Sequence, residues 1–593
     1  MPRPMHHQVE KPKNLKKSLL NLLKYCKKYL PLIIISAIFT IISTLISVYS
    51  PTLMGNISNQ IKQGIEGSLN KVQIIETIEL LAILYIVYSI FNYSVNFIMA
   101  TVTSKVSKNL RRDIFAKINK VPLKYYDKTT YGDILSRITN DVDTISQTLN
   151  NSISTLISAI FTLLGCLIIM FILNYIMSIT VILSTIIGLI IVAVIMSRSQ
   201  KYFVKRQQAL GKINGHIEEI YTNHMIVKTY NAEEITKEKF DKLNNQLRTF
   251  DHKSQFFSGL MQPLMGFVGN LGFVLVAIVG TILAINGKID FGTIVTFIIF
   301  VRLFSSPLTQ IAQGLTNLQS TGAASERVFE FLHEEELIDE TNKLSYIAPQ
   351  DVIGNVEFKN VSFGYSKDKT IIKDFSIKIK NGSKVAIVGP TGAGKTTIVN
   401  LLMNFYELNS GDIYIDGINT KDLTRRNIHD LFGMVLQDTW LFEGTIKENL
   451  KFNNKDVPDE KIYDACKACG LDHFIRSLPD GYNTILNDVT SISAGQKQLL
   501  TIARAMIQNS PMLILEEATS NVDTRTEVLI QKAMDKLTHG RTSFVIAHRL
   551  STIKNAKIIL VMNEGSIVEV GNHKELLQKD GFYAKLYNSQ FEN

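Results

Sequence analysis

The chain has 593 residues, more than one hydrophobic core accommodates, so at least two domains are expected. Apolar residues make up 46% of the chain and charged residues 20%, a mixture typical of a membrane part joined to a water-exposed part. The net charge of +10 fits a nucleic-acid binder or a membrane protein with basic cytoplasmic edges. Lysines crowd between Lys11 and Lys28, directly before the first apolar run, which favours the membrane protein and argues against nucleic acid as a partner.

Six apolar stretches follow, each near the roughly 20 residues that a helix needs to cross a lipid bilayer. The connectors after the second and fourth stretches are long, about 50 and about 60 residues, and rich in Lys and Arg, so the positive-inside rule places them in the cytoplasm. A cytoplasmic segment, residues 1–28, and a membrane all-α domain of six transmembrane helices, residues 29–320, are therefore predicted. The stretches are about 30–53, 78–101, 153–173, 177–196, 256–285 and 291–308.

Both long connectors have helical periodicity and must turn back at their far ends. We expect these turns near residues 122–127 and 213–217. Short transverse helices at the turns are expected to dock on a soluble domain.

Polar side chains inside the six stretches are few. They include Asn92, Asn96, Asn270 and Arg302. Such residues usually face a bundle interior or a wet cavity, where they line a substrate path or hold helices together. The sequence leaves both alternatives open.

A charged linker, residues 321–352, precedes a soluble α/β domain, residues 353–593, which opens with the alternating strand 356–363. Residues 389–396 read G-P-T-G-A-G-K-T, a phosphate-binding loop between a buried strand and a helix. Glycines let backbone N–H groups approach phosphate, Lys395 reaches the β- and γ-phosphates, and the Thr396 hydroxyl suits Mg²⁺. The predicted phosphate contacts are Gly389, Pro390, Thr391, Gly392, Ala393, Gly394, Lys395, Thr396 and Thr397.

Two carboxylates end a second buried strand, residues 512–515, at the mouth of the predicted parallel sheet. Glu516 can serve Mg²⁺, and Glu517 can polarise a water in line with the γ-phosphate. His548 follows another apolar strand, 542–547, and is a candidate for catalytic support. The fold class is thus a six-helix membrane domain joined to an α/β P-loop nucleotide-binding domain.

These motifs, in this order along the whole chain, resemble an ABC transporter of the exporter type, and in particular bacterial heterodimeric multidrug exporters. The resemblance implies ATP and Mg²⁺ as cofactors, ATP hydrolysis coupled to export, and a second half-transporter as partner. It implies that Tyr365 stacks on adenine, that Gln437 touches Mg²⁺ and the attacking water, and that His548 contacts the γ-phosphate. It further implies that Ser493, Gly495 and Gln496 bind the ATP held by the partner domain and that Asp523 belongs to the D-loop.

The chain departs from that family at three places. Glu516 replaces an aspartate, Ala494 replaces a glycine of the signature sequence, and residues 488–491 lack the usual acidic-glycine segment. The departures predict that this signature serves a degenerate ATP site and favour a heterodimer, although a homodimer remains possible.

The leading hypothesis is ATP-driven export of an apolar or amphipathic small substrate, whether drug, lipid or peptide. Alternatives are a regulatory subunit that binds but barely hydrolyses ATP, a soluble P-loop protein acting on nucleic acid, and an importer. The six apolar stretches argue against a soluble nucleic-acid protein. An importer is disfavoured because the membrane part and the ATPase part lie on one chain. Cys466 and Cys469 form a lone C-x-x-C, interpreted as ordinary helix cysteines and not as a metal site.

Overall fold

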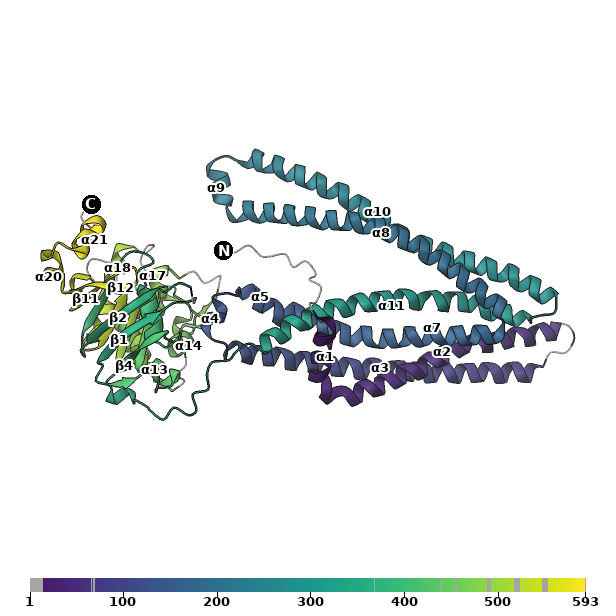
Figure 1. Cartoon of the computed structure of the whole chain (residues 1–593), viewed down its shortest axis with the longest axis horizontal. Helices are drawn as coiled ribbons and strands as arrows, with labels where there is room; N and C mark the ends of the chain where they lie inside the picture. Colours follow the sequence, from purple (N-terminus) through teal and green to yellow (C-terminus); the bar gives the residue numbers. More distant parts are fainter. Residues whose placement is uncertain are drawn as a thin grey trace. The chain divides into compact units, whose positions relative to one another are not determined.

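The computed structural model describes residues 14–65, 67, 70–366, 368–437, 439–452, 454, 456–487, 492–516, 523–546 and 553–591. These form two compact units (Figure 1). The helical unit comprises residues up to Lys120 together with Thr129–Glu334. The α/β unit comprises Val121–Lys128 and the chain from Glu335 onward.

Within its described residues, the helical unit contains six helices that are long and apolar enough to span a membrane, which confirms the predicted number. Each predicted stretch lies within one of them. Short π-helical turns at Arg137–Asp141 and Thr148–Ser152 link α5, α6 and α7 into one run. The helices are α1 (Leu15–Tyr25), α2 (Leu30–Ile65), α3 (Lys71–Ile118), α5 (Tyr131–Ser136), α6 (Val142–Gln147), α7 (Ile153–Leu173), α8 (Tyr175–Thr222), α9 (His224–Thr229), α10 (Glu233–Ile285) and α11 (Phe291–Leu332).

Helices α2 and α11 approach each other through glycine. A Cβ on Gly292 would lie 2.0 Å from the carbonyl oxygen of Gly55, so only glycine permits this spacing. One turn along α11, the Thr296 hydroxyl donates to the carbonyl of Pro51 at 3.2 Å. Small residues that let backbones meet are the usual basis of helix packing in membranes.

The second predicted turn is wrong. Residues 213–217 lie inside α8, which continues to Thr222, and the chain reverses through α9 into α10. His216 is buried, and its Nε2 lies 3.1 Å from the carbonyl oxygen of Thr236 on α10. Gly215 has no positive φ and so does not interrupt the helix. The packing of α8 against α10 outweighs the weak helix propensity of one glycine.

The first predicted turn is correct, and it forms α4 (Leu123–Tyr126), which belongs to the α/β unit. The other helices of this unit are α12 (Lys395–Leu402), α13 (Arg425–Leu431), α14 (Ile446–Lys451), α15 (Asp459–Ala468), α16 (Asp472–Ser477), α17 (Ala494–Gln508), α18 (Thr524–Thr538), α20 (His573–Gln578) and α21 (Phe582–Phe591). Its strands are β1 (Val356–Phe363), β2 (Ile372–Ile379), β3 (Lys384–Val388), β4 (Ser410–Ile415), β5 (Ile418–Asn419), β6 (Phe432–Val435), β7 (Gly444–Thr445), β8 (Ile485–Leu486), β9 (Met512–Glu516), β10 (Thr542–Ile546), β11 (Ile558–Asn563) and β12 (Ser566–Gly571).

The central sheet has six strands in the order β12-β11-β3-β10-β9-β6. All neighbours except β11 and β12 are parallel, so five strands present their carboxyl ends at one edge. Strands β3, β9 and β10 are almost fully buried, as their continuous apolar sequences require. The carboxyl edge of such a sheet is where ligands bind in open α/β folds.

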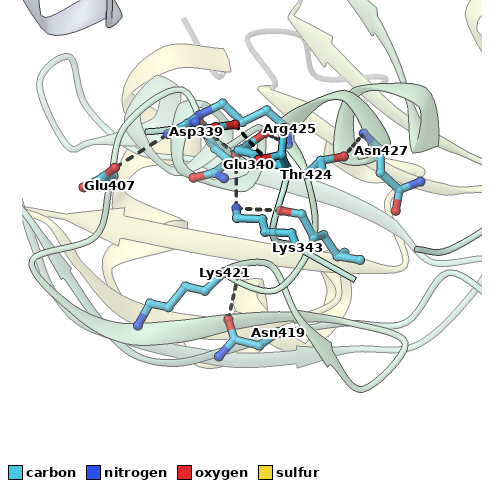
Figure 2. A network of polar contacts seen from close by, with 12 residues as sticks. Asp339, Glu340, Lys343, Glu407, Asn419, Lys421, Thr424, Arg425 and Asn427 are labelled. Carbon is cyan, nitrogen blue, oxygen red and sulfur yellow. Dashed lines mark hydrogen bonds and ion pairs between the residues drawn. The ribbon is translucent and has the colours of Figure 1, made fainter. Parts of the chain in front are cut away.

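The chain enters the α/β unit through a segment fixed by ion pairs (Figure 2). The Glu340 carboxylate accepts hydrogen bonds from the backbone N–H of Arg425 at 2.8 Å, its Nη1 at 3.0 Å and Nζ of Lys343 at 3.0 Å. Lys343 also donates to the carbonyl of Leu423 at 2.8 Å. The two units divide between Glu334 and Glu335, inside the predicted linker. The predicted limits of that linker, 321–352, remain a prediction.

Candidate nucleotide site

The phosphate-loop sequence forms the predicted strand–loop–helix unit between β3 and α12. Lys395 opens α12 and is only 8% exposed. Its Nζ donates to the carbonyl oxygens of Gly389 at 2.8 Å and Pro390 at 3.1 Å, so the loop is wrapped around the ammonium group. Burial lowers the pKa of Lys395. The loop thus places a desolvated cation at the N-terminus of a helix, which is the electrostatic setting that binds phosphate.

Glycine is required at the end of the loop. Gly394 has a φ of 98°, and a Cβ there would lie 2.6 Å from Cδ1 of Ile372. Its conformation lets α12 begin directly at Lys395, with the first N–H groups of the helix facing the loop. Gly392 also has a positive φ, of 83°.

Thr396 and Glu516 come together at the carboxyl edge of the sheet. The Thr396 hydroxyl lies 3.3 Å from Oε1 of Glu516, the last residue of β9. Gln437 is exposed and lies two residues beyond β6, whose Val435 is paired with Leu515. Parallel pairing therefore directs Gln437 and Glu516 out of the same sheet edge.

Two predicted residues lie outside the part of the chain that the structure describes, namely Glu517 and His548. Glu517 directly follows Glu516 in sequence. His548 comes two residues after Ile546, which ends β10 opposite Glu516 of β9 and Ile387 of β3. The described strands thus end at the same edge as the phosphate loop, and the roles of both residues remain predictions.

Tyr365 lies beside the first turn of α12. Its hydroxyl is 3.3 Å from the Thr397 hydroxyl, and its ring packs edge-on against Tyr406 at 5.0 Å. The Tyr406 hydroxyl donates to both oxygens of Asp127, each at 3.1 Å. Burial, followed by the neighbouring Asp127 carboxylate, raises the pKa of Tyr406. No pattern in the sequence singles out Tyr406, whereas Asp127 lies in the predicted turn 122–127.

The predicted signature residues begin α17. Ser493 caps this helix: its side chain accepts from the N–H of Gln496 at 3.2 Å, and the Gln496 side chain accepts from the N–H of Ser493 at 2.8 Å. Gly495 is buried in the first turn, whereas Ala494 is exposed at the helix start. Residues 488–491, the third departure from the family, lie outside the described chain. This end of α17 has the geometry of an anion-binding helix N-terminus.

Asp523 is the N-cap of α18. Its carboxylate accepts from the N–H of Thr526 and from its hydroxyl, both at 2.8 Å. These bonds lower the pKa of Asp523. Its position in this structure is explained by helix capping.

Cys466 and Cys469 are buried and free. Burial raises the pKa of the Cys466 thiol to about 11 and that of Cys469 to about 12. Within the described ranges, no cluster of three or more metal-ligating side chains occurs. The pair therefore packs as part of the core around α15 and α17.

Comparison with known proteins gives consistent matches over both units. The family model for the ABC transporter transmembrane region matches residues 33–308, and the ABC transporter model matches residues 372–520. The chain is 42% identical over 492 residues to the fatty acid ABC transporter ATP-binding/permease protein of Mycobacterium tuberculosis, covering 82% of this chain and 77% of the relative.

Two proteins of Bacillus subtilis match almost end to end. One is an uncharacterised ABC transporter ATP-binding protein, 38% identical over 584 residues, which are 98% of this chain and 96% of the relative. The other is an ATP-binding/permease protein whose name proposes multidrug export, 33% identical over 572 residues, 96% of this chain and 98% of the relative. The chain therefore belongs to the ABC transporter family, as a half-transporter of the exporter type that joins a multi-pass membrane domain to a cytoplasmic, ATP-hydrolysing domain.

Proposed function

We propose that this chain pairs with a second half-transporter and exports a small apolar or amphipathic substrate by alternating access. The observation that carries the proposal is the convergence of Lys395, Thr396 and Glu516 at one sheet edge of a chain that also has six candidate membrane spans. One relative is named for fatty acids, which are amphipathic, and the name of another proposes multidrug export; both names support the proposed cargo class.

ATP would be held by the phosphate loop and by Tyr365. Backbone N–H groups between Gly389 and Thr397, except at Pro390, would face the phosphates, and Lys395 would balance the charge of the β- and γ-phosphates. The Tyr365 ring, held edge-on by Tyr406, offers one face to adenine.

Mg²⁺ fits the oxygen donors of the site. The Thr396 hydroxyl and the Glu516 carboxylate lie 3.3 Å apart. Gln437 follows β6, which ends at the same edge of the sheet. Hard oxygen ligands of this kind suit Mg²⁺, which would neutralise phosphate charge in the bound nucleotide.

Glu517 would orient and deprotonate the attacking water, and His548 would hold the γ-phosphate. Both follow strands that end at the nucleotide edge, β9 and β10. Placing a carboxylate and an imidazole there supplies the positioning on which phosphoryl transfer depends.

The N-terminus of α17, with Ser493, Gly495 and Gln496, would bind the γ-phosphate of ATP held by the partner, and Asp523 would border that interface. The Ser493–Gln496 capping box must open for both side chains to reach phosphate. Ala494 adds a methyl group close to this approach, so this signature is proposed to serve the weaker site of a heterodimer.

The test is transport by the full-length chain in proteoliposomes, alone and with a co-expressed half-transporter. We expect ATP-dependent accumulation of an amphiphile only when the partner is present, and its loss with Glu517→Gln. Full transport by the chain alone would overturn the heterodimer. ATP hydrolysis with no movement of any amphiphile would overturn the export function.

A further inference from the structure

A cavity of about 440 Å³ lies between α10 and α11 in the helical unit. Four of its six lining side chains are apolar, and the other two carry a guanidinium and a hydroxyl group. The lining residues are Phe273, Ile298, Ile299, Arg302, Leu303 and Ser306. The cavity is of the size that binding sites for small amphipathic molecules have.

Arg302 lies deep in the predicted span. It is 11 residues beyond Phe291, or about 16 Å along the helix, close to the middle of a hydrocarbon core about 30 Å thick. Phe273 lies at a similar depth on α10, 12 residues before Ile285 and about 18 Å along it. Both residues therefore lie inside the predicted spans.

The chain offers Arg302 no counter-ion. Among the described residues, no carboxylate forms an ion pair with it. The sequence has no Asp or Glu in residues 30–65, 80–112, 153–217, 252–289 or 291–325. A second copy of the chain has the same deficit. An intramembrane arginine without a partner is costly and marks a functional position.

Ser306 adds a second polar group to the lining of the cavity. It follows Arg302 by one helical turn, and its Oγ accepts a hydrogen bond from Nε2 of Gln310 at 3.2 Å. Its neighbour Ser305 gives its own hydroxyl proton to the carbonyl of Val301 at 2.9 Å. No such donation by Ser306 occurs among the described residues, so its proton can be given to a ligand.

We infer that this cavity binds the carboxylate head of a single-chain amphiphile on Arg302 and Ser306, with its hydrocarbon chain against Phe273, Ile298, Ile299 and Leu303. The guanidinium fork matches a carboxylate in two parallel hydrogen bonds, and one positive charge balances one negative charge. A cavity of this volume suits one hydrocarbon chain better than the two of a phospholipid. The inference rests on the proposed export function and specifies its substrate class.

The test uses the full-length transporter in nanodiscs of phosphatidylcholine, without ATP. The probe is a photoactivatable 16-carbon carboxylic acid, compared with its methyl ester, and labelled peptides are identified by mass spectrometry. We expect the acid to label α10 and α11 and to be displaced by unlabelled palmitate.

Arg302→Gln should weaken acid binding by about tenfold or more, because it removes a charge-assisted hydrogen-bonded pair. Arg302→Lys keeps the positive charge but loses the two-bond fork, so it should weaken acid binding less than Arg302→Gln does.

Lys288→Gln is the matched control, since it removes one positive charge from the exposed turn between the same two helices. It should leave binding unchanged.

Any one of three results would overturn the inference. They are equal labelling of wild type by acid and ester, unchanged affinity in Arg302→Gln, and displacement by phosphatidylglycerol as effective as by palmitate. If the acid and ester bind equally while ATP still drives transport of another amphiphile, the inference fails and the proposed function stands. If the acid binds at Arg302 but no amphiphile is transported, the proposed function fails.

Discussion

The hydroxyl of Tyr406 donates to both carboxylate oxygens of Asp127, at 3.1 Å each. Tyr406 also packs edge-on against Tyr365, the candidate adenine-stacking residue, at 5.0 Å. Asp127 directly follows α4, in the segment that connects α3 to α5 along the chain. Two side-chain contacts therefore link the candidate base site to a residue between two helices of the membrane domain.

Removing the Tyr406 hydroxyl should weaken coupling between ATP hydrolysis and transport. Tyr406→Phe keeps the ring against Tyr365 and deletes only the bond to Asp127. Because hydrogen bonds to charged groups contribute about 1.5–3 kcal/mol, and less when partly exposed, substrate moved per ATP hydrolysed should fall roughly threefold to tenfold. The ratio is measured in proteoliposomes from parallel phosphate-release and transport assays.

Tyr414→Phe is the control for this variant, because no hydrogen bond of the Tyr414 hydroxyl occurs in the described chain. Since the pKa of Tyr406 is raised, its hydroxyl stays protonated below the unfolded value of about 10, and the bond is lost only at higher pH. The coupling ratio should therefore show no Tyr406-dependent change between about pH 6 and 9. A normal ratio in Tyr406→Phe would refute the link.

Neutralising Glu516 should weaken the binding of Mg²⁺. Glu516→Gln removes the carboxylate that lies 3.3 Å from the Thr396 hydroxyl. Loss of one such oxygen ligand should raise the Mg²⁺ concentration for half-maximal ATPase activity about tenfold. The measurement is a Mg²⁺ titration at constant ATP on the assembled transporter.

Glu516→Asp keeps the charge and should stay close to wild type, whereas Glu564→Gln, at the exposed turn between β11 and β12, should have no effect. Equal Mg²⁺ requirements in Glu516→Gln and wild type would exclude Glu516 from the metal site.

The features that sequence predicted well are local ones. The six spans follow from runs of apolar residues, and the phosphate loop from eight consecutive residues between a strand and a helix. Each signal lies within one short window, so no knowledge of the tertiary structure is needed to recognise it.

Features that depend on distant contacts were missed. Tyr406 and Asp127 are 279 residues apart, and no local pattern reports their hydrogen bond. The turn predicted at residues 213–217 is wrong, because α8 continues through Gly215 to Thr222. Helix α8 is held at this point by the burial of His216 against α10, a contact that only the folded structure reveals.

The corrected course of α8 predicts opposite effects for two glycine substitutions. A Cβ on Gly215 meets nothing within 4 Å, so Gly215→Ala should stabilise the protein by about 0.5–1 kcal/mol, the usual gain in helix propensity. Gly292→Ala would place a methyl group 2.0 Å from the Gly55 carbonyl and should force α2 and α11 apart. Thermal unfolding of the purified protein in detergent should show a higher midpoint for the first variant and a lower one for the second. If Gly215→Ala instead destabilises the protein, the chain turns at residues 213–217 and α8 does not continue through them.

The cysteine pair should be chemically silent at neutral pH. Because burial raises the pKa of Cys466 to about 11 and of Cys469 to about 12, almost no thiolate forms at pH 7.5. In a background with Cys26 and Cys166 replaced by Ser, a maleimide should modify the pair only after denaturation.

The same raised pKa values should make the protein less stable to unfolding at alkaline pH. An unfolded thiol has a pKa of about 8.5, so the folded protein favours the neutral thiols. Their contribution is complete below that pH and is lost as pH rises toward about 11, the folded value for Cys466. Tyrosines and lysines titrate in the same range, so the Cys466→Ala/Cys469→Ala variant is the reference. Between about pH 8.5 and 11 the unfolding midpoint of the protein that keeps both thiols should fall more steeply than that of the variant. Parallel slopes would show that folding does not raise the pKa of either thiol. Rapid maleimide labelling of the native protein at pH 7.5 would show that at least one thiol is accessible and ionised, as a redox or metal-binding C-x-x-C requires.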